Sequence, residues 1–373
     1  MTEKFSPVYC IVPPHMLKEI AERGTAKQKQ WALKTINTSA QFRGVRQALA
    51  EVTALGAPAV LPEKQRVIYD AKKGSTLPGQ SVRTEGSLPT GDVAIDEAYD
   101  GSGATYDLYK DIYGRTSIDD LGLRLDSTVH YEEGYDNAFW NGNQMVYGDG
   151  DENLPEKERL FNRFTIAIDI IGHELTHGVT QYEARLIYWE QPGALNESFS
   201  DVFGSLVKQR VLNQNANTAD WIIGQGLFTS NVNGQGIRSM KEPGTAYNDP
   251  VLGQDPQPAH MRDYKSVSYD NGGVHINSGI PNRAFYNVAK EIGGFAWEKT
   301  GKIWYVTLRD KLQVTSNFQQ AANLTYQAAE EIFGKESLEQ KAVRKGWSDV
   351  GINIGDDGKT GCLLSPASLI RRR

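Results

Sequence analysis

A nearly continuous run of apolar positions extends from Phe164 to Ile171 and is interrupted only by Thr165 and Asp169. An amphipathic surface helix would show polar residues at regular intervals, so this run predicts a helix that is buried on most of its surface. The predicted helix continues beyond the run and carries the residues HELTH at positions 173–177. We therefore expect two histidines deep inside the molecule.

Shorter patterns precede this helix. Arg66–Tyr69 and Thr128–Tyr131 alternate as half-buried strands do, while Asp92–Tyr113 has the spacing of a helix that packs on a sheet. Segments 136–142 and 147–151 are rich in turn residues and bracket a predicted hairpin at the edge of that sheet. The N-terminal half of the chain is therefore predicted to be rich in β-structure.

Helical patterns dominate the second half of the chain, where loops of Gly, Pro and Asn separate them. The predicted helices are Ala194–Val211, Ala219–Leu227, Pro281–Ile292, Ile303–Leu312, Phe318–Phe333 and Ser337–Val350. The two halves together predict an α+β fold with a β-rich N-terminal part and a mainly α-helical C-terminal part.

The first fifty residues form a separate head. Prolines at positions 7, 13 and 14 predict an extended start, and Leu17–Ile36 predicts two short helices with an interruption at Gly24. Ala48–Pro62 is rich in small residues and predicts a linker in which a protease could cut. The last residues, which end in Arg371–Arg373, are predicted to form a solvated tail.

Composition narrows the class of protein. A chain of 373 residues with 39% hydrophobic and 23% charged residues is long enough for two packed domains, and it is neither disordered nor fibrous. It has no apolar run of membrane-spanning length, and its first residues carry no readable secretory signal. Cys10 and Cys362 lie near opposite ends and suggest no disulfide framework.

The net charge of −6 is distributed unevenly. Residues 1–50 carry eight Lys or Arg against three Glu, a surplus of +5, so residues 51–373 carry −11. A basic head on an acidic body indicates a segment that docks onto the rest of the chain rather than an arm that binds nucleic acid.

The HELTH segment has the form of a zinc-binding motif. Residues four apart lie on one face of a helix, so His173 and His177 can direct two imidazoles at one point while Glu174 lies one step around the turn. Two histidines at this spacing can also form a hydrogen-bonded pair in a core. A third ligand would favour zinc, because catalytic zinc uses three protein ligands and keeps one position open.

The segment GALNESFSD at positions 193–201 offers that third ligand. Glu197 follows His177 by twenty residues, which allows the chain to turn back and present the carboxylate from a neighbouring helix. Asp201 lies four residues further along the same face and can accept the second ring N–H of a zinc-bound histidine. Without the histidine motif, both acids would be interpreted as an ordinary solvated face.

Five motifs occur in one order along the chain: DNAFWNG (136–142), YGDGD (147–151), HELTH (173–177), GALNESFSD (193–201) and DNGGVHINSG (270–279). In these motifs the chain resembles the thermolysin family of neutral zinc metallopeptidases, over a span from about Val67 to Gly351. The head, with its Pro-Pro-His-Met-Leu segment, is similar to the short propeptide of the protealysin-like branch.

The resemblance implies a thermolysin-like two-domain zincin that cuts internal bonds of peptides and proteins. The implied parts are a propeptide (1–50), a β-rich catalytic domain that ends in the HExxH helix (51–181), an α-helical catalytic domain (182–355) and a tail (356–373). His173, His177 and Glu197 would bind one catalytic Zn²⁺. Glu174 would be the general base that takes a proton from water and passes it to the leaving amine.

Further residues match the family's catalytic set. Tyr188 and His275 would donate hydrogen bonds to the oxyanion of the tetrahedral intermediate. Asp270 would accept from the imidazole of His275 and keep it protonated and oriented. Asp201 and Asn196 would support the zinc ligands. Taken alone, His275 would be interpreted as a structural loop histidine.

Substrate contacts are implied in the same way. Asn137 and the backbone of Ala138 match the sheet edge that pairs with an extended peptide, and Arg238 matches the arginine that binds a substrate carbonyl. An apolar pocket beside the zinc would be lined by Phe161, Phe164, Ile170 and Ile237. The pocket predicts a preference for bulky hydrophobic residues just after the cut, although the same four residues could simply be core.

The chain departs from the family at the double calcium site near Asp169. Lys208, Ile222 and Gln225 stand where three acidic ligands are expected. An ammonium cannot bind calcium, and Lys208 could instead pair with Asp169. We therefore expect no double calcium site of the thermolysin type, while calcium elsewhere stays open.

The resemblance also implies that the head assists folding or inhibits the enzyme until it is removed. Two interpretations of its inhibitory segment remain. The thiolate of Cys10 could block the zinc, with His15 beside it, or Cys10 could be a small core residue while Pro13–Leu17 occupies the cleft. A test of the first interpretation is the latency of a Cys10→Ser precursor.

Location and partners follow from the same resemblance. We expect a secreted, monomeric enzyme whose partners are its substrates and its own propeptide, with a cytoplasmic pool of precursor as an alternative because no signal is readable. Two rival functions remain: a zinc hydrolase that acts on another amide, such as cell-wall peptide, and a non-catalytic zinc protein whose head never leaves.

Overall fold

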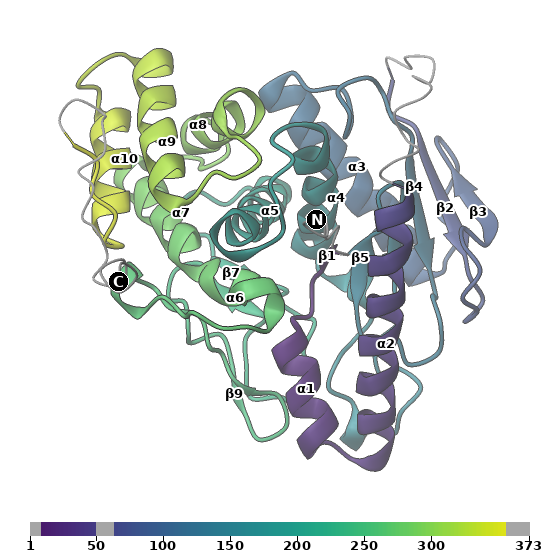
Figure 1. The fold of residues 1–373 in the computed structure, drawn as a ribbon. Coiled ribbons are helices and arrows are strands. Elements are labelled where there is room, and N and C mark those ends of the chain that lie inside the picture. Colours follow the sequence, from purple (N-terminus) through teal and green to yellow (C-terminus); the bar gives the residue numbers. More distant parts are fainter. Residues whose placement is uncertain (1–8, 50–62, 356–373) are drawn as a thin grey trace.

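The computed structural model describes residues 9–49 and 63–355 (Figure 1). The predicted linker at Ala48–Pro62 falls almost entirely outside these residues, and the predicted tail 356–373 lies outside them as well. Within the described residues, no helix is both long enough and apolar enough to cross a membrane.

One mixed sheet lies at the centre of the N-terminal half. Its strand order is β1-β5-β6-β4-β2-β3. The strands are β1 (Tyr9–Cys10), β2 (Arg66–Asp70), β3 (Gln80–Thr84), β4 (Leu125–Val129), β5 (Ala138–Trp140) and β6 (Met145–Tyr147). β4 runs parallel to β2 and β6, and the other pairs are antiparallel. The predicted hairpin is therefore confirmed as β5–β6, but its outer edge is covered by β1 from the head.

One strand boundary differs from the prediction. The pattern predicts a strand over Thr128–Tyr131, whereas β4 ends at Val129. The next residue, His130, has φ 53°. Because this value lies outside the β region, the backbone leaves the sheet there.

Two helices run through the middle of the molecule (Figure 1). α4 (Ile168–Tyr182) contains the histidine motif and α5 (Glu190–Val211) packs against it. α4 starts later than the apolar run, because Phe164–Ile166 forms a short 3₁₀ turn. The predicted burial of this helix is confirmed, since its residues from Asp169 to Thr180 are buried. The predicted helix at 92–113 is also present as α3 (Val93–Tyr113), with Asp92 as its N-cap.

Helices form most of the C-terminal half. They are α6 (Asp270–Asn277), α7 (Gly279–Ile292), α8 (Lys299–Val306), α9 (Phe318–Phe333) and α10 (Leu338–Ser348). Four of them overlap predicted helices, whereas α6 has no counterpart among the predictions. Asn271, Gly272 and Gly273 have positive φ angles inside α6, so this segment is not a regular helix. The α+β fold class is confirmed.

The predicted helix Ala219–Leu227 is wrong. Ile222–Ile223 instead forms β7, which pairs with β8 (Arg238–Ser239). Gly224 and Gly226 have φ angles of 76° and 86°, which a right-handed helix does not allow. A second short ribbon consists of β9 (Asn248–Asp249) and β10 (Gly253–Gln254).

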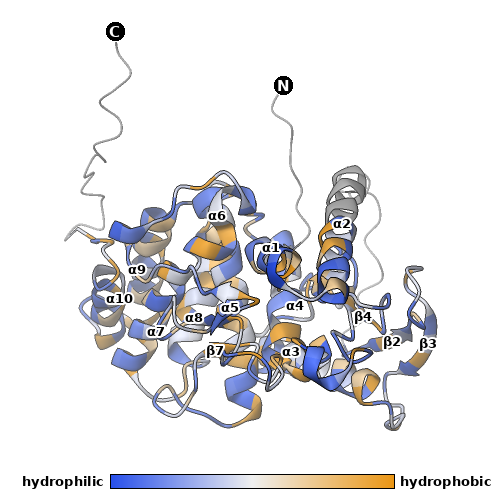
Figure 2. Ribbon diagram, turned by 90° about the horizontal axis from the view of Figure 1, so that it is seen from below, coloured by the Kyte–Doolittle hydropathy of each residue, from blue (hydrophilic) through white to orange (hydrophobic). Residues whose placement is uncertain are grey.

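The head forms α1 (Pro14–Arg23) and α2 (Ala26–Leu49). α2 has 24 residues and is much longer than the predicted short helix. Both helices lie on one face of the molecule, between α6 and the sheet, as Figures 1 and 2 show from two directions. The head therefore covers the boundary between the two halves.

Several apolar side chains of the docked head are buried. Met16, Leu17, Ile20, Trp31 and Ala32 are buried. Among the described residues, one ion pair links the head to the body, between Lys34 and Glu132 at 3.1 Å. The head therefore docks on the body, as the sequence indicates, although among the described residues a single ion pair reflects the opposite charges of the two parts.

Candidate active site

Two histidines and one glutamate converge between α4 and α5. The Nε2 atoms of His173 and His177 are 3.0 Å apart, and carboxylate oxygens of Glu197 lie 3.6 Å and 3.4 Å from them. All three side chains are fully buried. They can approach because the helices touch through glycines: a Cβ at Gly204 would lie 2.3 Å from the carbonyl oxygen of Asp169.

The hydrogen bonds made by Nδ1 of each ring determine whether Nε2 carries a proton or a lone pair. Nδ1 of His173 lies 2.8 Å from Asp201, and Nδ1 of His177 lies 2.8 Å from the side-chain oxygen of Asn196 and 3.0 Å from Ser200. When Nδ1 donates to these acceptors, each neutral ring presents a lone pair on Nε2 to the other ring.

Such an arrangement suits a cation. Two facing lone pairs and a buried carboxylate repel one another unless a positive charge lies between them. Glu197 Oε2 is buried and has no hydrogen-bond partner among the described residues. Nitrogen and oxygen donors in this number fit zinc. The structure therefore brings together the three predicted ligands, as well as Asp201 and Asn196 behind them.

Asp201 holds a wider network in place. Its carboxylate accepts hydrogen bonds from Nε of Arg238 at 2.8 Å and from the amide of Asn282 at 2.8 Å, besides its contact with His173. Burial alone would raise the pKa of Asp201, but the charge of Arg238 and the bond to His173 lower it below its usual range. The carboxylate thus stays ionised behind the histidine.

Glu174 lies on the side of α4 that faces the sheet. The backbone N–H of Trp140 in β5 donates to its carboxylate at 2.9 Å, and the side chain is fully buried. The contact places the predicted general base beside the strand edge that is predicted to receive substrate. The sequence does not predict the part played by the Trp140 amide, although Trp140 belongs to the motif DNAFWNG.

Tyr188, His275 and Asp270 form a second group beside the ligands. The tyrosine hydroxyl lies 3.1 Å from Nε2 of His275 and also donates to Glu197. Nδ1 of His275 lies 2.5 Å from Asp270. Although burial opposes a charge on the ring, Glu197 and Asp270 raise the pKa of His275 to about 9. The ring therefore carries a proton near neutral pH.

The head follows the edge strand past these residues. β1 pairs with β5, and the next residue, Ile11, donates its N–H to the carbonyl oxygen of Ala138 at 3.2 Å. Val12 donates to the side-chain oxygen of Asn137 at 2.9 Å. All three residues predicted to bind substrate backbone, including Arg238, contact the head in this structure.

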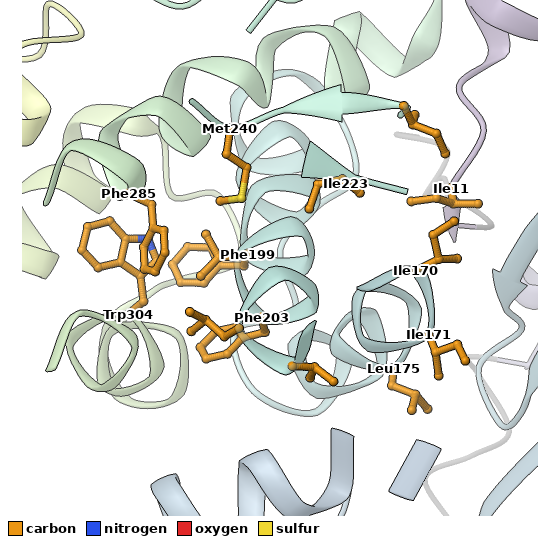
Figure 3. Close-up of a cluster of buried hydrophobic side chains, with 14 of the residues drawn as sticks. Ile11, Ile170, Ile171, Leu175, Phe199, Phe203, Ile223, Met240, Phe285 and Trp304 are labelled. Atoms are coloured by element: carbon orange, nitrogen blue, oxygen red, sulfur yellow. The ribbon is translucent and has the colours of Figure 1, made fainter. Parts of the chain in front are cut away.

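The predicted pocket residues Phe161, Phe164, Ile170 and Ile237 are all fully or almost fully buried. Ile170 and Ile237 lie close together, since a Cβ at Gly224 would meet both. Ile11 and Ile170 belong to the same cluster of buried side chains, part of which Figure 3 draws. Phe161 and Phe164 pack on each other with ring centroids 5.9 Å apart. The two isoleucines therefore lie where the head passes, and the two phenylalanines form a neighbouring aromatic pair.

The thiol of Cys10 does not face the metal ligands. Its Sγ donates to Ser39 at 3.5 Å, and the side chain packs in a small cluster with Tyr135 and Phe139. Successive side chains of a strand point to opposite faces, so Ile11 faces the cleft instead. The structure thus favours the core interpretation of Cys10. His15 is bound to Tyr247, 3.2 Å away, and burial lowers its pKa to about 4.

The segment that reaches the catalytic side chains begins earlier than predicted. Pro14 and Leu17 line a cavity of about 40 Å³ together with Tyr188 and His275. The hydrogen bonds to Asn137, Ala138, Arg238 and His275, however, come from residues 10–12. Proline cannot donate a backbone hydrogen bond, which explains why the paired segment precedes Pro13.

Comparison with known proteins gives a consistent result. Residues 37–181 match the model of the thermolysin metallopeptidase catalytic domain, and residues 184–352 match that of its alpha-helical domain. The chain is 47% identical over 354 residues to Protease PrtS of Photorhabdus sp. (strain Az29), a match that covers 94% of this chain and 93% of that protein. An extracellular metalloprotease of Pectobacterium carotovorum subsp. carotovorum is also 47% identical, with 94% and 98% covered.

A solved structure is similar over nearly the whole chain. The precursor of protealysin, a metalloproteinase from Serratia proteamaculans, superposes with a TM-score of 0.83 at 50% identity. The match covers 92% of this chain and 99% of that one.

Proposed function

Since the chain belongs to the thermolysin family of metallopeptidases, we propose that His173, His177 and Glu197 hold one catalytic zinc ion and that Glu174 acts as the general base. The chain is a neutral metalloendopeptidase made with an N-terminal propeptide. The observation that carries the residue assignment is the convergence of the three ligand atoms within 4.8 Å in a buried site.

Each side chain around this site has its own role in the proposed reaction. A bound zinc ion would supply Lewis acidity towards a peptide carbonyl and towards water. Glu174 takes a proton from the attacking water and transfers it to the leaving amine. Tyr188 and His275 donate hydrogen bonds to the oxygen that becomes negatively charged, and Asp270 keeps the His275 ring oriented.

Substrate binds as an added strand. The backbone of Ala138 and the amide of Asn137 pair with the peptide, while Arg238 binds a carbonyl oxygen. Contacts between the head and these same groups support this mode of binding. A bulky apolar residue just after the cut occupies the pocket at Ile170 and Ile237, with Phe161 and Phe164 behind it.

The head blocks this edge in the precursor, so removal of the head exposes it. We place the propeptide at 1–50, the two catalytic domains at 51–181 and 182–355, and a tail at 356–373. The Pectobacterium carotovorum relative, which is named as extracellular, supports secretion of this enzyme. We propose that the enzyme acts as a monomer. We also propose that it lacks the double calcium site, since Lys208 pairs with Asp169 at 2.9 Å.

Hydrolysis of casein by the head-free chain tests the proposal. We expect activity that is lost with a zinc chelator and in Glu174→Ala, while Glu174→Ala still binds zinc. Glu298→Ala, which changes an exposed carboxylate outside the site, is the matched control and should remain active. Activity that survives Glu174→Ala, or an inactive zinc-loaded chain without its head, would contradict the proposed chemistry.

A further inference from the structure

The head lies in the cleft with a definite register. Tyr9 pairs with Trp140 and Cys10 with Phe139, antiparallel to β5. Beyond the strand, Ile11 donates to Ala138, and Val12 both donates to and accepts from Asn137, at 2.9 Å and 3.4 Å. Four consecutive residues are thus held by backbone hydrogen bonds or strand pairing along one edge.

Two carbonyl groups of the head meet polar groups of the site. The carbonyl oxygen of Cys10 lies 3.1 Å from Nε2 of His275, and that of Ile11 lies 3.2 Å from the guanidinium of Arg238. The first of these carbonyls belongs to the peptide bond from Cys10 to Ile11, and the second belongs to the residue that follows this bond. The side chain of Ile11 is fully buried and belongs to the same apolar cluster as Ile170 (Figure 3).

We propose that the precursor hydrolyses its own Cys10–Ile11 bond and that the rest of the head stays docked as an inhibitor. The proposal rests on the proposed function, because it uses the same catalytic groups. Water adds its hydroxyl to the carbonyl carbon of Cys10 while the bond to the nitrogen of Ile11 breaks. Residues 1–10 leave with a C-terminal carboxylate, and Ile11 receives a proton and becomes an N-terminal amine.

The remaining head has enough contacts to persist after this cut. Met16, Leu17, Ile20 and Trp31 are buried at no more than 3% exposure, and they lie beyond the new N-terminus. The cut removes the pairing of β1, which is two residues long, and the contacts of Cys10 with Ser39 and His275. Cleavage at this bond therefore clips the head without activating the enzyme.

The full-length, zinc-loaded chain tests the proposal by intact-mass spectrometry. We expect loss of residues 1–10, a new N-terminus at Ile11, and a first-order rate that does not change with protein concentration. Glu174→Ala should stay intact, and the clipped chain should remain nearly inactive towards casein. A rate proportional to concentration, or a cut at another bond, would overturn the inference.

Substitutions at Ile11 test the register. Ile11→Ala empties the pocket and should slow the cut roughly tenfold. Ile11→Pro removes the N–H that binds Ala138 and should prevent the cut. Leu33→Ala is the matched control, because Leu33 is an apolar head residue that is 53% exposed. Equal clipping rates in Ile11→Ala and Leu33→Ala would show that the pocket does not hold Ile11.

Hydrogen exchange gives a readout that needs no turnover. In the Glu174→Ala precursor, the amides of Ile11 and Val12 should exchange slowly, since both donate to the catalytic domain. Free exchange at both amides would refute the register even if clipping occurred. If the head-free chain hydrolyses casein but the precursor keeps residues 1–10, this inference alone fails; if the head-free chain is inactive too, the proposed function fails with it.

Discussion

The ammonium of Lys208 lies 2.9 Å from the carboxylate of Asp169, deep between α4 and α5. It also contacts Asp220 at 2.9 Å and donates to the carbonyl oxygen of Ile222. Burial opposes the charge on Lys208, but Asp169 and Asp220 raise its pKa. One protonated side chain thus offsets part of the negative charge of the two carboxylates at this position.

Removing this charge should destabilise the protein. Lys208→Ala leaves Asp169 buried without its cation, which costs about 3 kcal/mol. We expect a lower midpoint of thermal unfolding, measured by circular dichroism, while Lys302→Ala at an exposed position has little effect. Equal midpoints for the two variants would mean that another group compensates for the lost charge.

Zinc affinity should depend on Asp201. Asp201→Asn weakens the hydrogen bond that orients His173, and such changes reduce metal affinity by about 10- to 100-fold. Competition with a chromogenic chelator measures the dissociation constant. Asp263→Asn, which changes an exposed residue outside the site, is the control. An unchanged constant in Asp201→Asn would remove Asp201 from the support of the metal site.

Docking of the head should depend on Gly134. A Cβ at this position would lie 2.2 Å from the indole of Trp31 in α2. Gly134→Ala should therefore loosen the head and raise the activity of the uncut precursor roughly tenfold, relative to the head-free form of the same variant.

The control variant Gly86→Ala distinguishes the effect of a clash with Trp31 from the effect of backbone strain. Gly86 has φ 77°, close to the 67° of Gly134, but a Cβ there would meet nothing within 4 Å. A short peptide substrate reports the activity of each precursor. A similar rise in both variants would assign the effect to strain rather than to contact with Trp31.

The pH dependence of stability should report on His130. Its ring lies 2.9 Å from Asp149 and 3.2 Å from Asp92. The hydrogen bond to Asp149 raises the pKa of His130 to about 9 from 6.5, although burial opposes this. The folded protein holds this proton more tightly than the unfolded chain, so the stabilisation is complete below about pH 6.5 and is lost as pH rises through about 9.

His130→Gln should therefore lose about 2 kcal/mol at pH 6 and little at pH 10. Thermal unfolding of both proteins between these pH values gives the difference directly. A difference that stays constant with pH would show that His130 does not carry the charge in the folded state.

Much of the site could be predicted because its parts are local. The spacing of His173 and His177 belongs to one helix, and that of Glu197 and Asp201 belongs to the next. Asn282 and the amide of Trp140 could not be predicted, because they reach the site from other elements. Nothing in the local pattern of either residue indicates that contact.

The sequence by itself determined the buried motif helix, the motif spacings and the α+β class, because periodicity and motif spacing depend on residues that lie close together in the sequence. Tertiary structure decided how they combine. It placed β1 on β5, set the carbonyl of Cys10 beside His275, 265 residues away, and paired Lys208 with Asp169. A two-residue strand has no periodicity of its own, and contacts over such separations depend on the packing of the whole chain.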